Sequence, residues 1–435
     1  MSITVIGYDG APLSPAARDA LDRATLVVGG ARHLSALVPG GGGGDGRDIP
    51  ATVTLGPLAP ALKALAGHDG PAVVLASGDP GFFGVLRALR DAELEPAQVI
   101  PAVSSIATAF ARAGIPWDDA LVVSTHGSGD GRDLRRAANV CRARPKVALL
   151  TGPDAGARQL AGELLRTGTG TEAGTGTEVE RVLVVAQRLD AASLNHGDNA
   201  ERVEVLTLAQ AAERADFAEP NVVLCLDPRY AGPGSGERSA SKRWLAGWTG
   251  RSGAWALPES AFDHRDGQIT KAEVRAQILA RLAPSLGELV WDLGAGSGSV
   301  GIECARFGAA VVAVEQDADS CGRIAANAAA HGVEVAVVRG RAPGVLADLP
   351  RPDAVFVGGG GLDVVRAALE HQPARIVVAL ASVERVGEVI RSLEADGRTV
   401  GGVLHQSSRL APLPDGTHRF AALNPVYVVW GNADD

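Results

Sequence analysis

An apolar run that ends in a cluster of glycines constrains this chain more than any other feature. Residues 289–298 read Leu-Val-Trp-Asp-Leu-Gly-Ala-Gly-Ser-Gly. Glycine tolerates positive φ and lets the backbone approach a ligand closely, so this run predicts a buried parallel strand that turns sharply into a helix. Residues 300–307 would form the helix and Gly308 would end it. The next apolar run, Ala310–Val314, predicts a second strand with Glu315 at its carboxyl end.

This unit predicts a site for an adenosine-containing cofactor. An acidic side chain about 20 residues beyond such glycines is placed to hold both ribose hydroxyls. The spacing here is Gly-x-Gly-x-Gly, and Ser299 stands where a dinucleotide fingerprint has its third glycine. Asp292, just before the loop, would repel a pyrophosphate but suit a sulfonium or an amino group. The pattern therefore favours S-adenosylmethionine over NAD, and a glycine turn of some other α/β protein is the remaining alternative.

Composition excludes several classes of function. The chain has 435 residues, 46% of them hydrophobic, which predicts two or three globular domains. No apolar run is long enough to cross a bilayer, and the first residues predict a strand instead of a signal peptide. The four cysteines and nine histidines show no metal or disulfide spacing, so we expect a cytoplasmic protein without a bound metal. With a net charge of −9 and no run of Lys or Arg, neither nucleic acid nor a membrane is an expected partner.

A turn-rich break divides the chain into two α/β halves. We place a linker at residues 229–250, between a domain over 1–228 and one over 251–435, and interpret the glycine-rich stretches 39–45 and 167–177 as surface loops. Apolar runs alternate with helical stretches on both sides of the linker. The predicted strands before it are Ile3–Ile6, Thr25–Val28, Ala72–Ala76, Gln98–Ile100, Leu121–Ser124, Lys146–Leu150, Val182–Ala186 and Asn221–Leu226. The predicted strands after it are Leu289–Leu293, Ala310–Val314, Glu334–Val338, Asp353–Val357, Arg375–Leu380, Thr399–Leu404 and Val426–Trp430. Seven strands with the glycine loop after the first predict a doubly wound, Rossmann-like sheet.

The second half carries four blocks of sequence that occur together in one known family. They are residues 257–271, which end in Ile-Thr-Lys, the glycine loop, Gly-Arg-Ala-Pro at 340–343, and Phe-Val-Gly-Gly-Gly at 356–360. Over about residues 255–430 the chain resembles the decarboxylating precorrin methyltransferases of cobalamin biosynthesis. The resemblance implies a class I S-adenosylmethionine-dependent methyltransferase fold whose cofactor contacts are Thr270, Gly294, Ala295, Gly296, Ser297, Gly298, Glu315, Gly340, Arg341 and Ala342. The stretch from Thr270 to Glu273 also predicts a capping box at a helix start.

The first half carries a different set of blocks. Ser-Gly-Asp-Pro-Gly-Phe-Phe-Gly at 77–84 follows a buried strand, Pro-Ala-Val-Ser-Ser follows at 101–105, and Leu-Thr-Gly-Pro lies at 150–153. Over about residues 1–228 the chain resembles the tetrapyrrole methylase superfamily, which implies two small lobes with the cofactor between them. The cofactor contacts implied are Gly78, Asp79, Pro80, Ser104, Ser105 and Gly152. On the substrate side we expect Gly7 and Asp9, with Arg32 either binding a substrate carboxylate or anchoring its loop. His33 and His126 fit structural roles better than proton transfer.

Together the two resemblances imply one pathway of chemistry. The first domain would methylate C5 of precorrin-6B, and the second would methylate C15 and decarboxylate the ring C acetate, with one S-adenosylmethionine per domain and precorrin-8X as the product. Arg265, Lys271 and Arg341 are candidates to pair with substrate carboxylates. The substrate could be metal-free or contain cobalt, and the family resemblance predicts a homo-oligomer. An NAD-dependent reductase and a non-enzymatic tetrapyrrole carrier are the alternatives.

Overall fold

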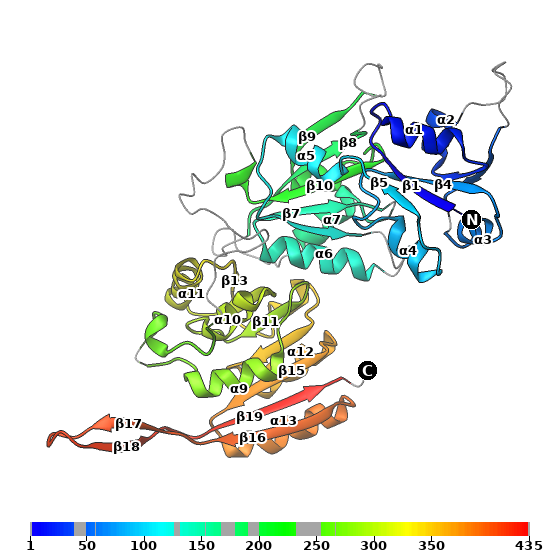
Figure 1. Cartoon of the computed structure of the whole chain (residues 1–435). Coiled ribbons are helices and arrows are strands. Elements are labelled where there is room, and N and C mark those ends of the chain that lie inside the picture. The colour runs from blue at the N-terminus through cyan, green and yellow to red at the C-terminus, as the bar shows by residue number, and fades with distance from the viewer. Residues whose placement is uncertain are drawn as a thin grey trace.

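The structure is a computed structural model, and it describes residues 2–38, 49–56, 58–125, 131–152, 154–166, 179–189, 200–231, 254–265 and 267–433. Within these ranges the chain forms two five-stranded sheets, one seven-stranded sheet and a two-stranded hairpin (Figure 1). The predicted loops at 39–45 and 167–177, the linker from residue 232 onward and His126 lie outside them. None of the helices described is long and apolar enough to span a membrane.

The first lobe of the N-terminal half is built on a parallel sheet. Its strand order is β3 (Ala51–Thr54), β2 (Leu26–Gly29), β4 (Pro71–Ser77), β1 (Ser2–Tyr8) and β5 (Gln98–Ile100). The helices of this lobe are α1 (Pro15–Asp22), α2 (Ala31–Leu37), α3 (Leu58–Ala66) and α4 (Val85–Asp91). Two apolar clusters, one on each face of the sheet, include residues of these helices. Because all five strands run parallel, their carboxyl ends meet at one edge, which faces the second lobe.

The second lobe has a mixed sheet. Its order is β6 (Leu121–Ser124), β7 (Lys146–Leu150), β10 (Asn221–Leu226), β8 (Val182–Gln187) and β9 (Arg202–Thr207). Among its hydrogen-bonded neighbours only β6 and β7 pair in parallel, and the other pairs are antiparallel. The helices are α5 (Ser105–Ala113), α6 (Arg132–Ala143), α7 (Ala157–Leu165) and α8 (Leu208–Glu213). Helix α5 packs on one face of this sheet, and α6, α7 and α8 pack on the other.

The C-terminal half is the doubly wound sheet that the sequence predicts. Its order is β13 (Ala336–Arg339), β12 (Ala310–Glu315), β11 (Leu289–Leu293), β14 (Ala354–Val357), β15 (Arg375–Leu380), β19 (Val426–Asn432) and β16 (Thr399–His405). One face is covered by α9 (Ala272–Leu282), α10 (Ser299–Phe307) and α11 (Ala318–Ala330). The other face is covered by α12 (Leu362–Glu370) and α13 (Val383–Ala395). A hairpin of β17 (Ser408–Pro412) and β18 (His418–Ala422) extends away from this body (Figure 1).

The predicted strands are all present within one or two residues at each end, and Gly308 ends α10 with φ of +105°, as expected. Sequence reasoning missed β3, β9 and the hairpin strands. Strand β3 is short and mostly exposed, so it shows none of the apolar pattern that marks a buried strand. Strand β9 does alternate, with Val203 and Val205 between polar residues, and that signal was overlooked.

The predicted capping box at Thr270 is wrong. Helix α9 begins at Ala272 after Lys271, which makes no side-chain cap. The amide of Ala272 donates instead to the carboxylate of Glu259, 2.8 Å away. Arg409 of the hairpin holds both Glu259 and Glu273, so Glu273 is paired across the tertiary structure and cannot fold back onto the helix start.

A buried ion pair fastens the segment before α9 to the domain. Arg275 and Glu303 are fully buried, with 2.7 Å between Nε and Oε1. Glu303 also accepts the backbone N–H groups of Ala256 and Leu257, and Arg275 donates to the carbonyl of Thr270. Because every charged atom of this pair meets a partner, the pair holds the backbone of Ala256, Leu257 and Thr270 against α9 and α10, directly ahead of the glycine loop.

Candidate functional site

The glycine loop of the C-terminal half lies at the switch point of its sheet. Strand β11 is hydrogen-bonded to β12 on one side and β14 on the other, and the chain order reverses there. Gly294, Gly296 and Gly298 have φ of +70°, +58° and +74°. A Cβ built on Gly294 would lie 2.9 Å from the backbone nitrogen of Gly359, which follows β14. Any residue other than glycine at 294 would therefore clash with the loop after β14. The two loops meet at the point where doubly wound sheets bind ligands.

Glu315 lies beside this loop, as predicted. Its Oε2 accepts the N–H of Gly296 at 2.9 Å and its Oε1 accepts that of Asp317 at 3.0 Å. The backbone carbonyl of Glu315 accepts the N–H of Gly340. The predicted turn at Gly340–Ala342 therefore begins beside the carboxyl end of β12. An ionised carboxylate has about four acceptor positions, and these two hydrogen bonds occupy two of them. Glu315 therefore shapes the loop and keeps further acceptor capacity.

Asp292, just before the glycine loop, is buried and bonds to the start of α10. Its carboxyl group is 1% exposed, and Oδ2 accepts the N–H of Gly301 in the first turn of α10 at 2.8 Å. Oδ1 has no hydrogen-bond partner among the described residues. Burial raises the pKa of Asp292 to about 7, and the nearby charge of Glu315 adds to the effect. The group supports the junction of strand and helix beneath the loop.

The candidate substrate residues of this half come from the segment before α9 and from the turn after β13. Hydrogen bonds from Ser320 lower the pKa of the half-buried Asp317, and the nearby charge of Arg265 contributes to this effect. Lys271 donates to the carbonyl of Gly267 at 3.2 Å, and Arg341 is exposed. Thr270 contributes its carbonyl to Arg275, so the contact described for it is structural.

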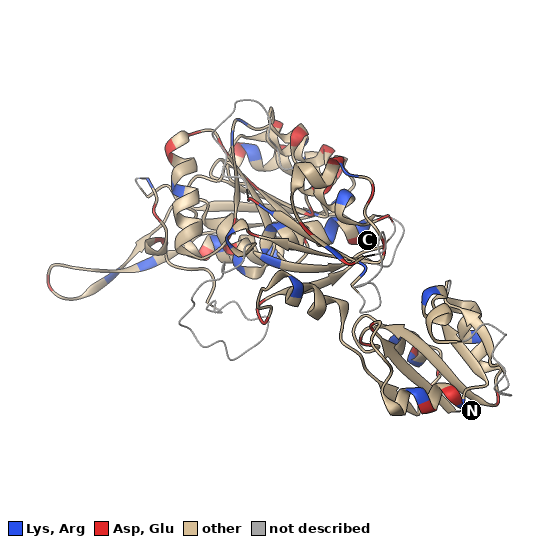
Figure 2. Cartoon of the chain, turned by 90° about the horizontal axis from the view of Figure 1, so that it is seen from above, with Lys and Arg blue, Asp and Glu red and all other residues tan. Residues whose placement is uncertain are grey.

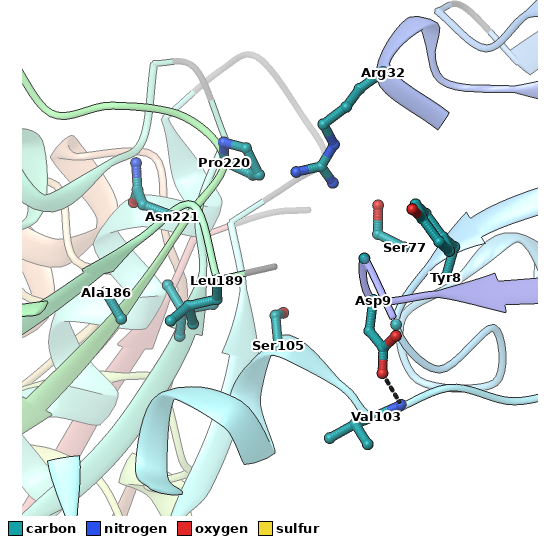
Figure 3. A pocket seen from close by; sticks show the side chains of 13 residues that line it. Tyr8, Asp9, Arg32, Ser77, Val103, Ser105, Ala186, Leu189, Pro220 and Asn221 are labelled. Carbon is teal, nitrogen blue, oxygen red and sulfur yellow. Dashed lines mark hydrogen bonds between the residues drawn. The ribbon is translucent and has the colours of Figure 1, made fainter. Parts of the chain in front are cut away.

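The N-terminal half has an open cleft between its lobes (Figure 3). Four predicted residues line it: Asp9, Arg32, Gly78 and Ser105. The second lobe supplies an apolar wall with one amide, from Ala186, Leu189, Pro220, Asn221 and Val222. Sequence reasoning missed this wall because no motif marks the ends of β8 and β10. It also missed Ser77, which begins the block at 77–84, and Tyr8, which lies between the predicted Gly7 and Asp9.

Several predicted residues build the cleft's loops. Ser104 caps α5 by accepting the N–H of Ala107, and Asp79 accepts the N–H of Gly81. Asp9 accepts the N–H groups of Ala11 and Val103, the latter drawn in Figure 3, so its carboxylate ties the loop after β1 to the loop after β5.

Close backbone approaches complete these loops. A Cβ on Gly7 would lie 2.2 Å from the carbonyl oxygen of Gly78, and Pro80 is the next side chain met there. Gly152 forms a bridge with Ala155.

Arg32 reaches into the cleft from the start of α2 (Figure 3). Its Nη2 lies 3.2 Å from Nε2 of the buried His33, which in turn lies 3.3 Å from the hydroxyl of Ser77. The ring of Tyr8 meets that of His33 edge-on at 5.7 Å. His33 thus lies behind three residues that line the cleft, which agrees with the structural role predicted for it. A guanidinium facing an open cleft is suited to binding a carboxylate.

The chain combines a two-lobed cleft with a doubly wound sheet that carries a glycine loop, and the family models identify the two halves as methyltransferase domains. Residues 8–185 match the tetrapyrrole (corrin/porphyrin) methylases, and residues 260–429 match the precorrin methyltransferase domain. The precorrin-6Y C(5,15)-methyltransferase [decarboxylating] of a Sinorhizobium species is 36% identical over 85% of this chain and 81% of its own length. The chain belongs to the precorrin-6Y C5,15-methyltransferase (decarboxylating) family.

Two shorter relatives each match about half of the chain. The cobalt-precorrin-7 C(5)-methyltransferase of Salmonella typhimurium is 33% identical over 52% of this chain and 100% of its own length. A probable cobalt-precorrin-6B C(15)-methyltransferase (decarboxylating) of Pyrobaculum calidifontis is 36% identical over 40% of this chain and 93% of its own length.

We expect Asp292→Asn to change how the stability of the C-terminal half depends on pH. A carboxyl group whose pKa rises on folding stabilises the fold only in its protonated form, so its contribution is present below pH 4 and is lost as the pH rises through 7. Between pH 5 and pH 8 the wild type should lose about 2–3 kcal/mol of unfolding free energy that the variant keeps. Asparagine Oδ1 still accepts the N–H of Gly301. Urea unfolding at both pH values measures the difference, and parallel pH profiles for the two proteins would contradict the assignment.

Proposed function

We propose that this chain methylates a precorrin at C5 and C15 and removes the carboxyl group of the ring C acetate, as a step of cobalamin biosynthesis. The observation that carries the proposal is the presence of two unlike sites, the cleft of the N-terminal half and the glycine loop at the switch point of the C-terminal sheet. The names of the two shorter relatives divide the same activities, C5 in one and C15 with decarboxylation in the other. We assign C5 to residues 1–228 and C15 with decarboxylation to residues 251–435.

Each half would use one S-adenosylmethionine. In the C-terminal half the glycine backbone leaves open space at Gly296, where an added Cβ would meet nothing within 4 Å. Glu315 and the buried Asp292 place two carboxyl groups at the loop, which suits a ligand carrying a sulfonium and an amino group. In the N-terminal half Gly78 and Ser105 are the predicted contacts that line the cleft, and Asp79, Pro80, Ser104 and Gly152 shape its loops.

The chain needs to supply little acid–base chemistry. The sulfonium methyl is already activated, and its acceptor is an electron-rich carbon of the conjugated ring. The protein holds donor and acceptor in line and excludes water, and such placement can lower a barrier by about 7–11 kcal/mol. The apolar wall of Ala186, Leu189 and Val222 would exclude water in the N-terminal cleft.

Arginine and lysine side chains would bind the substrate's peripheral carboxylates. In the N-terminal cleft this role falls to Arg32, whose guanidinium is oriented by His33. In the C-terminal half it falls to Arg265, Lys271 and Arg341. Lys and Arg are interspersed with Asp and Glu along the described chain (Figure 2), and the net charge is −9, so binding depends on these local cations and not on an overall positive field.

We expect Glu315→Ala to weaken one of two S-adenosylhomocysteine sites. Isothermal titration of the full chain should resolve two sites, and the variant should weaken only one, by about 1–3 kcal/mol, because charged hydrogen bonds to the ribose are lost. Glu315→Gln keeps an oxygen for the N–H of Gly296 and should lose less. Glu384→Ala, which removes an exposed carboxylate on α13, is the matched control. If affinity stays unchanged, Glu315 only supports the loop.

Mass spectrometry of precorrin-6B incubated with the protein and methyl-labelled S-adenosylmethionine tests the reaction. The wild type should add two labelled methyl groups and remove one CO₂. Asp79→Ala, which frees the N–H of Gly81 in the loop after β4, should lose methylation at C5 and retain decarboxylation. Glu315→Ala should show the reverse pattern. An unchanged mass would identify a tetrapyrrole carrier, and turnover that requires NADH would identify a reductase. A parallel reaction with the cobalt-containing substrate decides whether the metal-free or the cobalt-containing precorrin is used.

We further propose a homo-oligomer that assembles through the hairpin of β17 and β18. Leu410 and Phe420 face each other across the two strands and are 62% and 74% exposed. Paired exposed apolar side chains on a strand pair that leaves the body favour burial against another copy. We expect Phe420→Ser to lower the molar mass measured by light scattering and Arg419→Ser, its exposed neighbour on the same strand, to leave it unchanged. A monomeric wild type would refute the assembly.

We also propose a cytoplasmic location, in keeping with four cysteines that are all free thiols.

A further inference from the structure

The C-terminal sheet lacks one of its covering helices. The connections from β11 to β12, from β12 to β13 and from β14 to β15 contain α10, α11 and α12. The connection from β13 to β14 contains only a short 3₁₀ turn, Leu346–Asp348. Helices α10 and α11 cover one face of the sheet, and this connection lies on the opposite face, against β11 and β12. On that opposite face α12 and α13 cover the strands farther along the sheet.

Helix α6 of the N-terminal half packs where that helix is missing. Its last residue, Ala143, is buried in the same apolar cluster as Leu289, Ala310 and Val312 of the C-terminal sheet. On its other side α6 packs into the second lobe through Ala137, Val140 and Cys141. One helix is therefore shared by the cores of both halves.

Polar contacts fix the position of α6 along its length. Arg135 pairs with Asp353 at 2.7 Å, with side chains 29% and 16% exposed. One turn later the side-chain amide of the buried Asn139 donates to the carbonyl of Gly287 at 3.1 Å. At the helix end Arg181 donates to the carbonyls of Cys141 and Arg144 and also binds Glu334. These partners recur at helical spacing, which is what a specific docking surface requires.

All these contacts lie at one edge of the C-terminal sheet. Gly287, Glu334 and Asp353 precede β11, β13 and β14, so they lie at the amino-terminal edge. The glycine loop and Glu315 lie at the carboxyl edge, about 17 Å away along a five-residue strand. A change in the docking surface therefore leaves the candidate cofactor site intact.

We propose that the surface formed by Arg135, Asn139, Ala143 and Arg181 is a docking site for the C-terminal half of the same chain, which keeps the two halves associated when the linker peptide is cut. The ion pair and the hydrogen bond give this contact its register, and Ala143 supplies the apolar contact that the short connection between β13 and β14 leaves open.

Cutting the linker in the full chain tests this directly. A protease recognition sequence inserted between residues 229 and 250 allows the folded protein to be cut, and sedimentation over a dilution series then gives the dissociation constant of the halves. We expect the cut wild type to sediment as one particle. Arg135→Glu should raise the dissociation constant by about ten-fold or more, because it places like charges together at a partly buried contact. Arg23→Glu, an equal charge change at the residue that follows α1, should leave it within about two-fold.

A double-mutant cycle separates this contact from general destabilisation. Asp353→Asn removes the charge and keeps an oxygen to accept the N–H of Leu289. The combination of Arg135→Met with Asp353→Asn should cost little more than either change alone. Separate sedimentation of the wild-type halves, equal effects of Arg23→Glu and Arg135→Glu, or fully additive changes in the cycle would each overturn the proposal. S-adenosylhomocysteine binding by the uncut variants confirms that they are folded.

Discussion

The close approach of two loops at the carboxyl edge of β11 and β14 is the constraint on which the C-terminal half depends. Gly294 and Gly359 nearly touch, and Glu315 bonds to the backbone of Gly296 from the neighbouring strand. No side chain larger than hydrogen fits at Gly294, so the loop remains open for a ligand only if β11, β12 and β14 keep their register. The buried carboxyl of Asp292 accepts the N–H of Gly301 and so joins β11 to α10 next to the loop. Burial disfavours its charged form and raises its pKa to about 7.

A second layer of charged contacts holds the segment ahead of α9 in position. Arg275 and Glu303 bind its backbone, and Arg409 joins Glu259 and Glu273 to the base of the hairpin. The Arg409 guanidinium lowers the pKa of Glu259 to about 2, so this link persists over the whole physiological range. The proposed ligand site and the proposed oligomer contact are thus connected through one arginine.

The two halves use unrelated architectures for their proposed cofactor sites. The N-terminal half forms a cleft between two lobes, whereas the C-terminal half uses the switch point of a single sheet. Helix α6 joins them at the edge of the C-terminal sheet that is farthest from its glycine loop. The contact between the halves therefore lies away from the glycine loop.

Local sequence determined the elements and the loops. The alternation of apolar runs, the glycines at 294, 296 and 298 and the acid at 315 depend on neighbours a few residues away, so they could be interpreted without coordinates. Tertiary structure alone decided which partner each side chain meets. Asp292 accepts the N–H of Gly301 in α10, Glu273 binds Arg409 instead of capping α9, and Ala143 enters the core of the other half. These outcomes depend on contacts between residues far apart in the chain, and no local pattern encodes which distant group arrives at a given position.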